Sequence, residues 1–402
     1  MAHFHRKGVF LSIFAPLFVW LTVIPSRASE PQQKGAPPEQ TMSAKEYLVY
    51  IGTYTREASE GIYVWRFSPS SGEITSLGLA AEIREPSFLA LHPQGNVLYA
   101  VSETDDYDEA GSGSITAFRI HRETGKLSRI NQVSSGGGWP CHLQVDQTGR
   151  MLAVANYRDG RVASVPLERA GRLGKVSSLA QHEGSSVNPE RQEGPHAHSV
   201  NFSPDNRYLV AADLGLDKLL IYRVNLAQGS LETEQPGVVK IDAGAGPRHF
   251  AFGPSGRFGY LINELQSSVT VFRYQARSGQ LEELQTISTL PEDFKGANTT
   301  AEIGIHPSGS FLYGSNRGHD SIAIFAIDGV KGTLRRVDNV PTLGKTPRNF
   351  AIDPTGATLF AANQDSDTVV LFRIDAQTGR LTAVGRELRV DSPVCVKFVA
   401  SR

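Results

Sequence analysis

The 402-residue chain contains few cysteines, no surplus of either charge and none of the short motifs that mark the common metal and nucleotide sites. Its 2 cysteines are too few for a disulfide framework or a cysteine-based zinc site. The 40 basic and 41 acidic residues give a net charge of -1, which argues against a nucleic-acid binder, because such proteins need a surplus of Lys and Arg. The patterns HExxH, CxxC, CxxCH and GxxxxGKS/T are absent, which excludes the zinc, haem and P-loop classes that they mark.

The amino terminus is typical of a secretory signal. Arg6 and Lys7 precede an uncharged, largely apolar run over residues 8–25, and small residues suited to a signal peptidase follow, ending at Ala28. An uncleaved membrane anchor is the alternative, because the run approaches the length that spans a bilayer. No later segment is long and apolar enough to cross a membrane.

The rest of the chain divides into a linker and one folded body. Residues 29–46 are rich in Pro and Gln and have nothing to bury, which predicts a flexible linker. We therefore predict a signal peptide at 1–28, a linker at 29–46 and a single domain at 47–402. The signal predicts export to the periplasm or the extracellular space.

Two phrases recur along the body at intervals of about fifty residues, which is the spacing of a repeat architecture. The first is an apolar strand, a Pro-x-Gly turn and a second apolar strand, with turns at Pro93, Gln147, Pro204, Pro254, Pro307 and Pro354. The second is a strand followed by Gly-x-Leu or Gly-x-Ile, at Gly72, Gly125, Gly171, Gly229, Gly279, Gly332 and Gly379. Such turns connect hairpins, and the segments between them are short and rich in Val, Ile, Phe and Tyr. Each unit therefore predicts four antiparallel strands, as in the blade of a β-propeller.

The first phrase occurs six times and the second seven times, and the two ends of the body explain the difference. The body begins at YLVYIGTYT, which matches the second strand of a unit. Residues 392–398 resemble the first-strand openings at 246–250 and 346–350. The last strand would then complete the first blade and close the ring, which removes exposed sheet edges. We predict an all-β, seven-bladed β-propeller with four antiparallel strands per blade, closed by the C-terminal strand.

The turn glycines also predict which side chains meet at one mouth of the central channel. The first two strands of a blade are antiparallel, so residues equally spaced about the turn between them are neighbours. Eight positions either way from Gly256 lie Arg248 and Glu264. The residues predicted at this mouth are His198, Arg248, Glu264, Arg317, Arg348, Glu103 and Tyr157, with His142, His196, His249 and Glu302 close by.

Arginines around one cleft suit an anionic ligand, because a guanidinium group binds carboxylate or phosphate through two hydrogen bonds. The Arg248–Glu264 pair orients a carboxylate that could act as a general base, and a structural salt bridge is the alternative. His196 and His198 could offer two metal ligands, but the sequence fixes no third, so we predict no metal and no other cofactor. Cys141 is a weak candidate for a nucleophile.

Six stretches of the body carry a family resemblance: YIGTYT (50–55), PHAH (195–198), GPRH (246–249), NEL (263–265), SNRGHD (315–320) and TPR (346–348). On these, the chain resembles the seven-bladed lactonase family, which includes propeller-type 6-phosphogluconolactonases and fungal carboxymuconate-lactonizing enzymes. The resemblance implies an enzyme that acts on a lactone ring in a cleft of His, Arg and Glu. His198 (or His196), Arg248 and Glu264 match the functional set. A further arginine of that set corresponds to either Arg317 or Arg348, which the sequence does not separate.

The resulting hypothesis is a hydrolase that opens a sugar-acid δ-lactone, as 6-phosphogluconolactonase does. Water would attack the ring carbonyl, Glu264 or a His would take its proton, and the arginines with His198 would hold the anionic group and stabilise the oxyanion. The predicted catalytic residues are His198, Arg248 and Glu264, and the predicted substrate-binding residues are His196, Arg317, Arg348, His142, Glu103 and Tyr157. The expected partner is a small anionic lactone, without nucleic acid or, after signal cleavage, membrane, and we expect a monomer.

Two other functions remain open at this stage. One is a cycloisomerase that forms or opens a muconolactone. The other is a propeller that binds an anionic ligand in the cell envelope without catalysis, since folds of this kind serve many functions. A phosphorylated sugar lactone is a cytoplasmic metabolite, so the predicted export leaves the exact lactone open.

Overall fold

The computed structural model describes residues 11–13, 15–17, 46–56 and 58–401. Almost all of the predicted signal (1–28) and linker (29–46) therefore lies outside the described residues. The chain divides into two units, Met1–Ser43 and Ala44–Arg402, and every described strand belongs to the second. In the described part of the chain, no helix has the length and apolar character needed to span a membrane.

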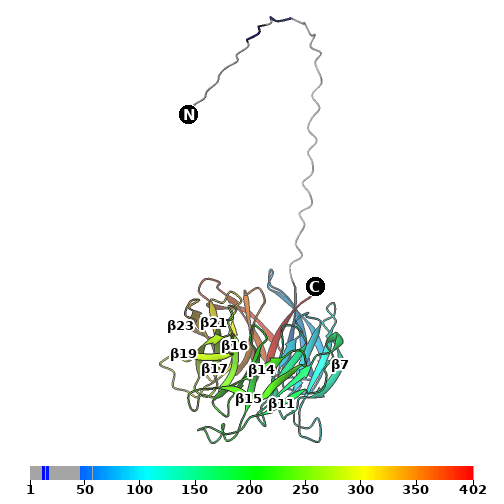
Figure 1. Cartoon of the computed structure of the whole chain (residues 1–402), viewed down its shortest axis with the longest axis vertical. Helices are drawn as coiled ribbons and strands as arrows, with labels where there is room; N and C mark the ends of the chain where they lie inside the picture. Colours follow the sequence, from blue (N-terminus) through cyan, green and yellow to red (C-terminus); the bar gives the residue numbers. More distant parts are fainter. Residues whose placement is uncertain (1–10, 14, 18–45, 57, 402) are drawn as a thin grey trace, which may run out of the picture. The chain divides into compact units, whose positions relative to one another are not determined.

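The second unit folds into seven four-stranded antiparallel sheets that form the blades of a propeller (Figure 1). The first blade consists of β28 (Pro393–Ala400), β1 (Tyr47–Thr53), β2 (Gly61–Ser68) and β3 (Glu73–Glu82). The second blade consists of β4 (Leu89–Leu91), β5 (Val97–Ser102), β6 (Ser114–Ile120) and β7 (Leu127–Ser134). The third consists of β8 (Pro140–Val145), β9 (Met151–Asn156), β10 (Arg161–Pro166) and β11 (Ser178–Gln181). The fourth consists of β12 (Ala197–Phe202), β13 (Tyr208–Asp213), β14 (Lys218–Asn225) and β15 (Ser230–Lys240). The fifth blade consists of β16 (Pro247–Phe252), β17 (Phe258–Asn263), β18 (Ser268–Gln275) and β19 (Gln280–Ser288). The sixth consists of β20 (Thr299–Ile305), β21 (Phe311–Arg317), β22 (Ser321–Ile327) and β23 (Leu334–Pro341). The seventh consists of β24 (Pro347–Ile352), β25 (Thr358–Asn363), β26 (Thr368–Ile374) and β27 (Leu381–Arg389). Two short 3-10 turns, η1 (Arg169–Gly171) and η2 (Gln364–Ser366), lie in loops.

The C-terminal strand closes the ring, so the predicted seven-bladed propeller and its mode of closure are confirmed. β28 pairs antiparallel with β1, from Ala400 opposite Tyr47 to Cys395 opposite Gly52 (Figure 1). The innermost strands also contact one another all the way round, in the order β28, β4, β8, β12, β16, β20, β24 and back to β28. Every residue of β1 is buried, as expected for a strand paired on both sides.

The hydrophobic core lies between neighbouring blades. The fourth and fifth blades, for example, pack Tyr208 and Val210 against Phe250, Leu261 and Phe272. Each sheet is therefore apolar on both faces, and burial of these side chains supplies the main driving force for folding.

The recurring glycine of the second phrase is required by its conformation and by its neighbour. Gly279 has a φ of +75°, which favours glycine, and a Cβ there would lie 2.6 Å from the ring of Tyr208 in the preceding blade. In the first phrase the turn residue likewise has a positive φ, 67° at Gly256, and Asn206 occupies this position in the fourth blade with a φ of 56°. Both phrases thus recur because the backbone makes the same turn in each blade.

Buried tyrosines bind four of the seven blades to a turn of the next blade. The hydroxyl group of Tyr260 on β17 donates to the carbonyl oxygen of Gly332, 3.0 Å away in the sixth blade. Tyr50, Tyr99 and Tyr313 make the same bond from β1, β5 and β21, to Gly125, Gly171 and Gly379. The repeat therefore encodes contacts between blades as well as the strands within them.

A β-bulge recurs where the innermost strands begin. The register of pairing with the second strand shifts across Cys141, His198, Arg248 and Arg348, each of which is left without a partner residue. A bulge redirects a side chain that regular alternation would point elsewhere. These four residues line a common space in the central channel.

Candidate active site

A cavity of about 320 Å³ opens at the mouth of the channel where the innermost strands begin. It is lined by Glu103, Trp139, Cys141, Tyr157, Arg191, His198, Glu264, Thr299, Arg317 and Arg348. A narrow space of about 10 Å³, which Arg248 lines together with His198 and Arg348, continues from it into the channel. We call the cavity and this narrow space the cleft. All the predicted site residues except His142 and His196 line it.

Three arginines hold the Glu264 carboxylate, which directly follows β17. Arg248 Nε and Arg317 Nη2 lie 2.8 and 3.0 Å from Oε2, and Arg191 Nη2 lies 2.8 Å from Oε1. Burial alone would raise the pKa of Glu264, but the Arg317, Arg248 and Arg191 guanidinium groups outweigh it and hold that pKa well below the ordinary value. Glu264 is therefore a permanent anion that fixes three cations, and a poor proton acceptor.

Arg248 continues this network into the channel. Its Nη1 donates to the carbonyl oxygen of Ala301 at 2.6 Å and lies 3.4 Å from Nε2 of His249. His249 Nδ1 lies 3.0 Å from Oε1 of Glu302. Because a guanidinium group only donates, these partners assign the proton of the neutral His249 ring to Nδ1. Burial lowers the pKa of His249, which agrees with a neutral ring.

Glu103 is the second carboxylate of the cleft, and its environment differs from that of Glu264. The hydroxyl group of Tyr54 lies 3.1 and 3.3 Å from its two oxygens. Burial raises the pKa of Glu103, and the opposing charge of Arg348 and the hydrogen bonds only partly offset the effect. Two carboxylates whose pKa values move in opposite directions are assigned different chemical roles, and Glu103, whose pKa is raised, is the better proton acceptor of the two.

Arg348 and Arg317 provide unused donors. The Arg348 guanidinium lies 5.3 Å from the centre of the Tyr54 ring, and no carboxylate of the described residues is within ion-pair distance of it. The buried Nε of Arg317 has no hydrogen-bond partner among the described residues. Four arginines against two carboxylates also leave the cleft cationic. An anionic group would satisfy these donors.

His198 and Cys141 lie together in the cleft as uncharged groups. His198 Nε2 is 3.9 Å from Oε2 of Glu264, and its Nδ1 is 3.7 Å from Sγ of Cys141. Burial lowers the pKa of His198 well below its usual value, and the nearby Arg248 lowers it further. Burial raises the pKa of Cys141, so it stays a thiol and lacks the thiolate that nucleophilic catalysis requires.

His142 and His196 lie outside the cleft, which corrects their sequence-based placement. The bulge turns Cys141 toward the cleft, and the next residue, His142, lines the opposite half of the channel. The His196 ring stacks on Tyr157 with centroids 4.5 Å apart, and its Nδ1 lies 3.0 Å from the Tyr157 carbonyl oxygen. His196 therefore positions Tyr157. In the described part of the chain, no group of three or more His, Cys, Asp or Glu side chains could hold a metal ion.

Among the residues that line the larger cavity or contact Glu103 there, sequence reasoning missed Tyr54, Trp139, Arg191 and Thr299. Arg191 comes from the loop between β11 and β12, which no turn glycine places relative to the cleft. Tyr54 follows β1 and belongs to the YIGTYT stretch, so its position in a family phrase was an available signal. Trp139 directly precedes the Pro that opens β8, a place beside the bulge.

A family model described as "Lactonase, 7-bladed beta-propeller" matches residues 48–398. The chain therefore belongs to this family of seven-bladed lactonases. It is 37% identical over 354 residues to the 6-phosphogluconolactonase of Bacillus subtilis (strain 168), a match that covers 88% of this chain and 99% of the relative. It is 38% identical over 307 residues to a 6-phosphogluconolactonase of Formosa agariphila, covering 75% and 85%.

A solved structure extends this comparison. The periplasmic gluconolactonase PpgL of Pseudomonas aeruginosa superposes with a TM-score of 0.83 at 36% identity, covering 89% of this chain and 100% of that one. The predictions of the lactonase family and of a lactone-hydrolysing enzyme resembling 6-phosphogluconolactonase are confirmed by these relatives.

Proposed function

We propose that the protein hydrolyses an anionic sugar-acid δ-lactone in the cleft. The observation that carries the proposal is the convergence of four arginines on a cavity that holds two carboxylates of opposite pKa shift. The relatives named 6-phosphogluconolactonase support this substrate class.

Arg348 and the free Nε of Arg317 bind the anionic group of the substrate in this proposal. Arg348 is the stronger candidate, because its charge has no carboxylate partner within ion-pair distance in the described structure. Burial alone would lower the pKa of Arg348, but Tyr54, Glu103 and Glu264 raise it above the ordinary value, so the group stays charged. A guanidinium group can bind a phosphate or carboxylate through two hydrogen bonds.

Glu103 is the proposed general base. A water molecule attacks the ring carbonyl carbon while Glu103 takes its proton, and the oxyanion forms beside the neutral His198 and the fixed guanidinium groups. When the ring C–O bond breaks, the proton returns from Glu103 to the ring oxygen. Glu264, which sequence reasoning considered as the base, instead positions Arg248, Arg317 and Arg191. Sugar-acid δ-lactones already open in water, so no covalent nucleophile is needed.

Replacement of Arg248 and of Glu264, which holds three of the arginines in place, tests the proposal. Arg248→Ala and Glu264→Gln should each lower lactone hydrolysis by about a hundredfold or more, since a single stabilising donor contributes about that much to a rate. Proton release from a panel containing 6-phosphogluconolactone, gluconolactone and muconolactone measures the rates. The exposed Arg335→Ala is the matched control and should keep the wild-type rate.

Near-normal rates for both cleft variants would remove these residues from the mechanism. Turnover of muconolactone alone would indicate a cycloisomerase, and tight binding of lactones without turnover a ligand-binding propeller. A preference for gluconolactone over its phosphate would show that the cationic cleft recognises something other than a phosphoryl group.

We also propose that residues 1–28 are cleaved as a signal, that residues 29–46 are a linker and that the domain at 47–402 acts outside the cytoplasm as a monomer, without a cofactor, nucleic acid or membrane. The apolar run at 8–25 and the likeness to a periplasmic gluconolactonase support this proposal. Amino-terminal sequencing of the protein recovered from cell fractions tests it. Recovery of the uncut chain from the cytoplasm would overturn it.

A further inference from the structure

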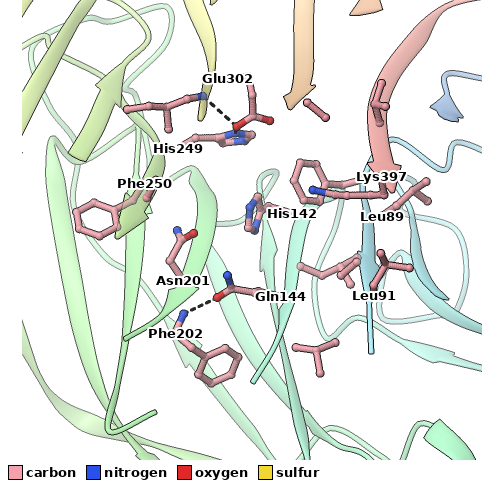
Figure 2. A pocket seen from close by; sticks show the side chains of 18 of the residues that line it. Leu89, Leu91, His142, Gln144, Asn201, Phe202, His249, Phe250, Glu302 and Lys397 are labelled. Atoms are coloured by element: carbon pink, nitrogen blue, oxygen red, sulfur yellow. Dashed lines mark hydrogen bonds and ion pairs between the residues drawn. The ribbon is translucent and has the colours of Figure 1, made fainter. Parts of the chain in front are cut away.

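The opposite half of the central channel contains a second cavity, of about 570 Å³ (Figure 2). It is lined by later residues of the seven innermost strands, and we call it the second chamber. Aromatic rings separate it from the cleft: Phe88 and His142 lie 4.3 Å apart between centroids, and His142 and His249 lie 5.1 Å apart. Its volume is within the range of small-molecule sites.

Lys397 places a cation in the second chamber. It belongs to the closing strand β28, and its Nζ lies 4.7 Å from the centre of the Phe88 ring. Among the residues that the structure describes, no carboxylate is within ion-pair distance of this ammonium group. Figure 2 shows the Lys397 side chain reaching across the chamber toward His142. A half-buried cation of this kind needs an anionic or polar partner.

The carboxylate that lines the chamber, Glu302, already has hydrogen-bond partners for both of its oxygens. Glu302 Oε1 accepts bonds from His249 Nδ1 and from the Ile303 backbone N–H, each 3.0 Å long. Its Oε2 accepts from the side-chain amide of Asn349. The charge of Lys397 helps to lower the pKa of Glu302, but the two groups are not within ion-pair distance, so the N–H donors of Lys397 remain available.

Two further donors face the same space. Nδ1 of His142 accepts the Val200 backbone N–H at 3.3 Å, which assigns the ring proton to Nε2. Gln144 accepts the Phe202 backbone N–H at 2.5 Å through its oxygen, so its amide N–H groups remain for another partner (Figure 2). Burial and nearby cations lower the pKa of His142 well below its usual value, so the ring donates while uncharged.

Apart from Asn201, the remaining side chains that line the chamber are apolar. They include Leu89, Leu91, Phe202, Phe250, Ile303, Phe350 and Val396. A ligand with many hydroxyl groups, such as a sugar acid, would place most of those groups against apolar side chains, where they lack hydrogen-bond partners. A carboxylate attached to an apolar body would match both the donors and the walls.

We propose that the second chamber is a binding site for a small organic carboxylate with an apolar body. The carboxylate is held by Lys397, with His142 and Gln144 as hydrogen-bond donors, and the apolar body lies against the walls below them. The site is distinct from the cleft, because the cleft has four arginines, whereas the second chamber has a single lysine, a few other polar side chains and a largely apolar side-chain lining.

Calorimetric titration with benzoate tests the proposal. Benzoate should bind the wild-type protein with a Kd of about 1 mM or tighter, and Lys397→Met should weaken binding at least tenfold, as loss of a charge-assisted hydrogen bond predicts. Lys397→Arg should retain binding. The exposed Lys175→Met is the matched control and should bind as the wild type does.

Benzamide and inorganic phosphate complete the experiment. Benzamide has the same ring without the charge, and phosphate has charge without the apolar body, so both should bind at least about tenfold more weakly than benzoate. No benzoate binding, equal binding to Lys397→Met, or equal binding of either probe overturns the proposal. Should Lys397→Met fail to fold, the probe comparison on the wild type and a Gln144→Leu variant, expected to weaken benzoate binding, still decide it.

Discussion

At the residue scale, the cleft separates two carboxylates by their neighbours. Glu264 is surrounded by three guanidinium groups, whereas Glu103 has a tyrosine hydroxyl and one more distant arginine. A carboxylate paired with cations keeps its charge and loses basicity, and a desolvated one gains basicity. This difference predicts different effects of replacing each residue by its amide.

Glu103→Gln should lower kcat by about a hundredfold or more, as loss of a general base does. In the wild type the base is active when deprotonated, so kcat should fall as the pH drops through the raised pKa of Glu103. That acidic limb should begin above the ordinary range of a glutamate and disappear in Glu103→Gln. The pH profile of kcat measures both effects.

Glu264→Gln is the comparison for this profile. It should lower the rate through displaced arginines but keep the acidic limb, because the pKa of Glu264 lies well below the range where the limb occurs. A limb that persists in Glu103→Gln, or vanishes in Glu264→Gln, would contradict the assignment of the base.

Sequence reasoning reached part of this site. The spacing about Gly256 placed Arg248 beside Glu264, and the structure shows them 2.8 Å apart. It did not place Arg191, because that residue reaches Glu264 from a loop with no repeat counterpart. Nor could it place His142, because a bulge changes which of two adjacent residues faces the cleft. The directions of the pKa shifts depend on burial and on neighbours from several blades, and residue spacing within one blade carries no information on either.

At the scale of the strand and its turn, the repeat was the most informative part of the sequence. Turn glycines and alternating strands predicted the blade, since the backbone must reverse at each Pro-x-Gly and each Gly-x-Leu. The bulges were not predictable, because an unpaired residue in β16 or β24 leaves no mark in the alternation of apolar residues. The bulged residues are nevertheless those that the chemistry uses.

At this scale we predict the effect of removing one hydrogen bond between blades, the bond from Tyr260 to Gly332. Tyr260→Phe should lower the free energy of unfolding by about 1 to 3 kcal/mol, because the buried carbonyl oxygen of Gly332 loses its donor while the packing is unchanged. Denaturant titration measures the change. The exposed Tyr107→Phe is the control and should change stability by less than about 0.5 kcal/mol. Equal effects of the two variants would show that the bond between blades contributes nothing measurable.

At the scale of the whole molecule, closure was predictable from a mismatch in counting. The phrase with the Pro-x-Gly turn occurs six times and the phrase with Gly-x-Leu or Gly-x-Ile seven times, so one blade lacks its first strand at the start of the body. Only the C-terminal segment resembles such a strand. The structure places that strand, β28, on β1, with Ala400 opposite Tyr47. The same strand carries Lys397 into the second chamber, so closure of the ring also completes that cavity.

Removal of β28 tests how much the fold depends on closure. A chain that ends before Pro393 would leave one long side of β1 unpaired and its apolar face uncovered, so we expect aggregation and loss of cooperative unfolding. Light scattering and calorimetry measure these two effects. A truncated chain that stays monomeric and unfolds at the wild-type temperature would show that six complete blades suffice.

A circular permutant tests whether the ring needs β28 at the C-terminus of the chain or only needs β28 to be present. Ser401 donates its backbone N–H to the carbonyl oxygen of Glu46 at 2.9 Å, so the end of β28 already lies beside the start of β1. A short glycine-containing turn can therefore join residues 392–401 ahead of Glu46, which makes β28 and β1 an ordinary hairpin. This permutant should recover the unfolding temperature of the parent domain, because every interstrand pair is kept and only the connection changes. If the permutant aggregates as the truncated chain does, closure depends on the order in which the strands are connected, and not on β28 being present.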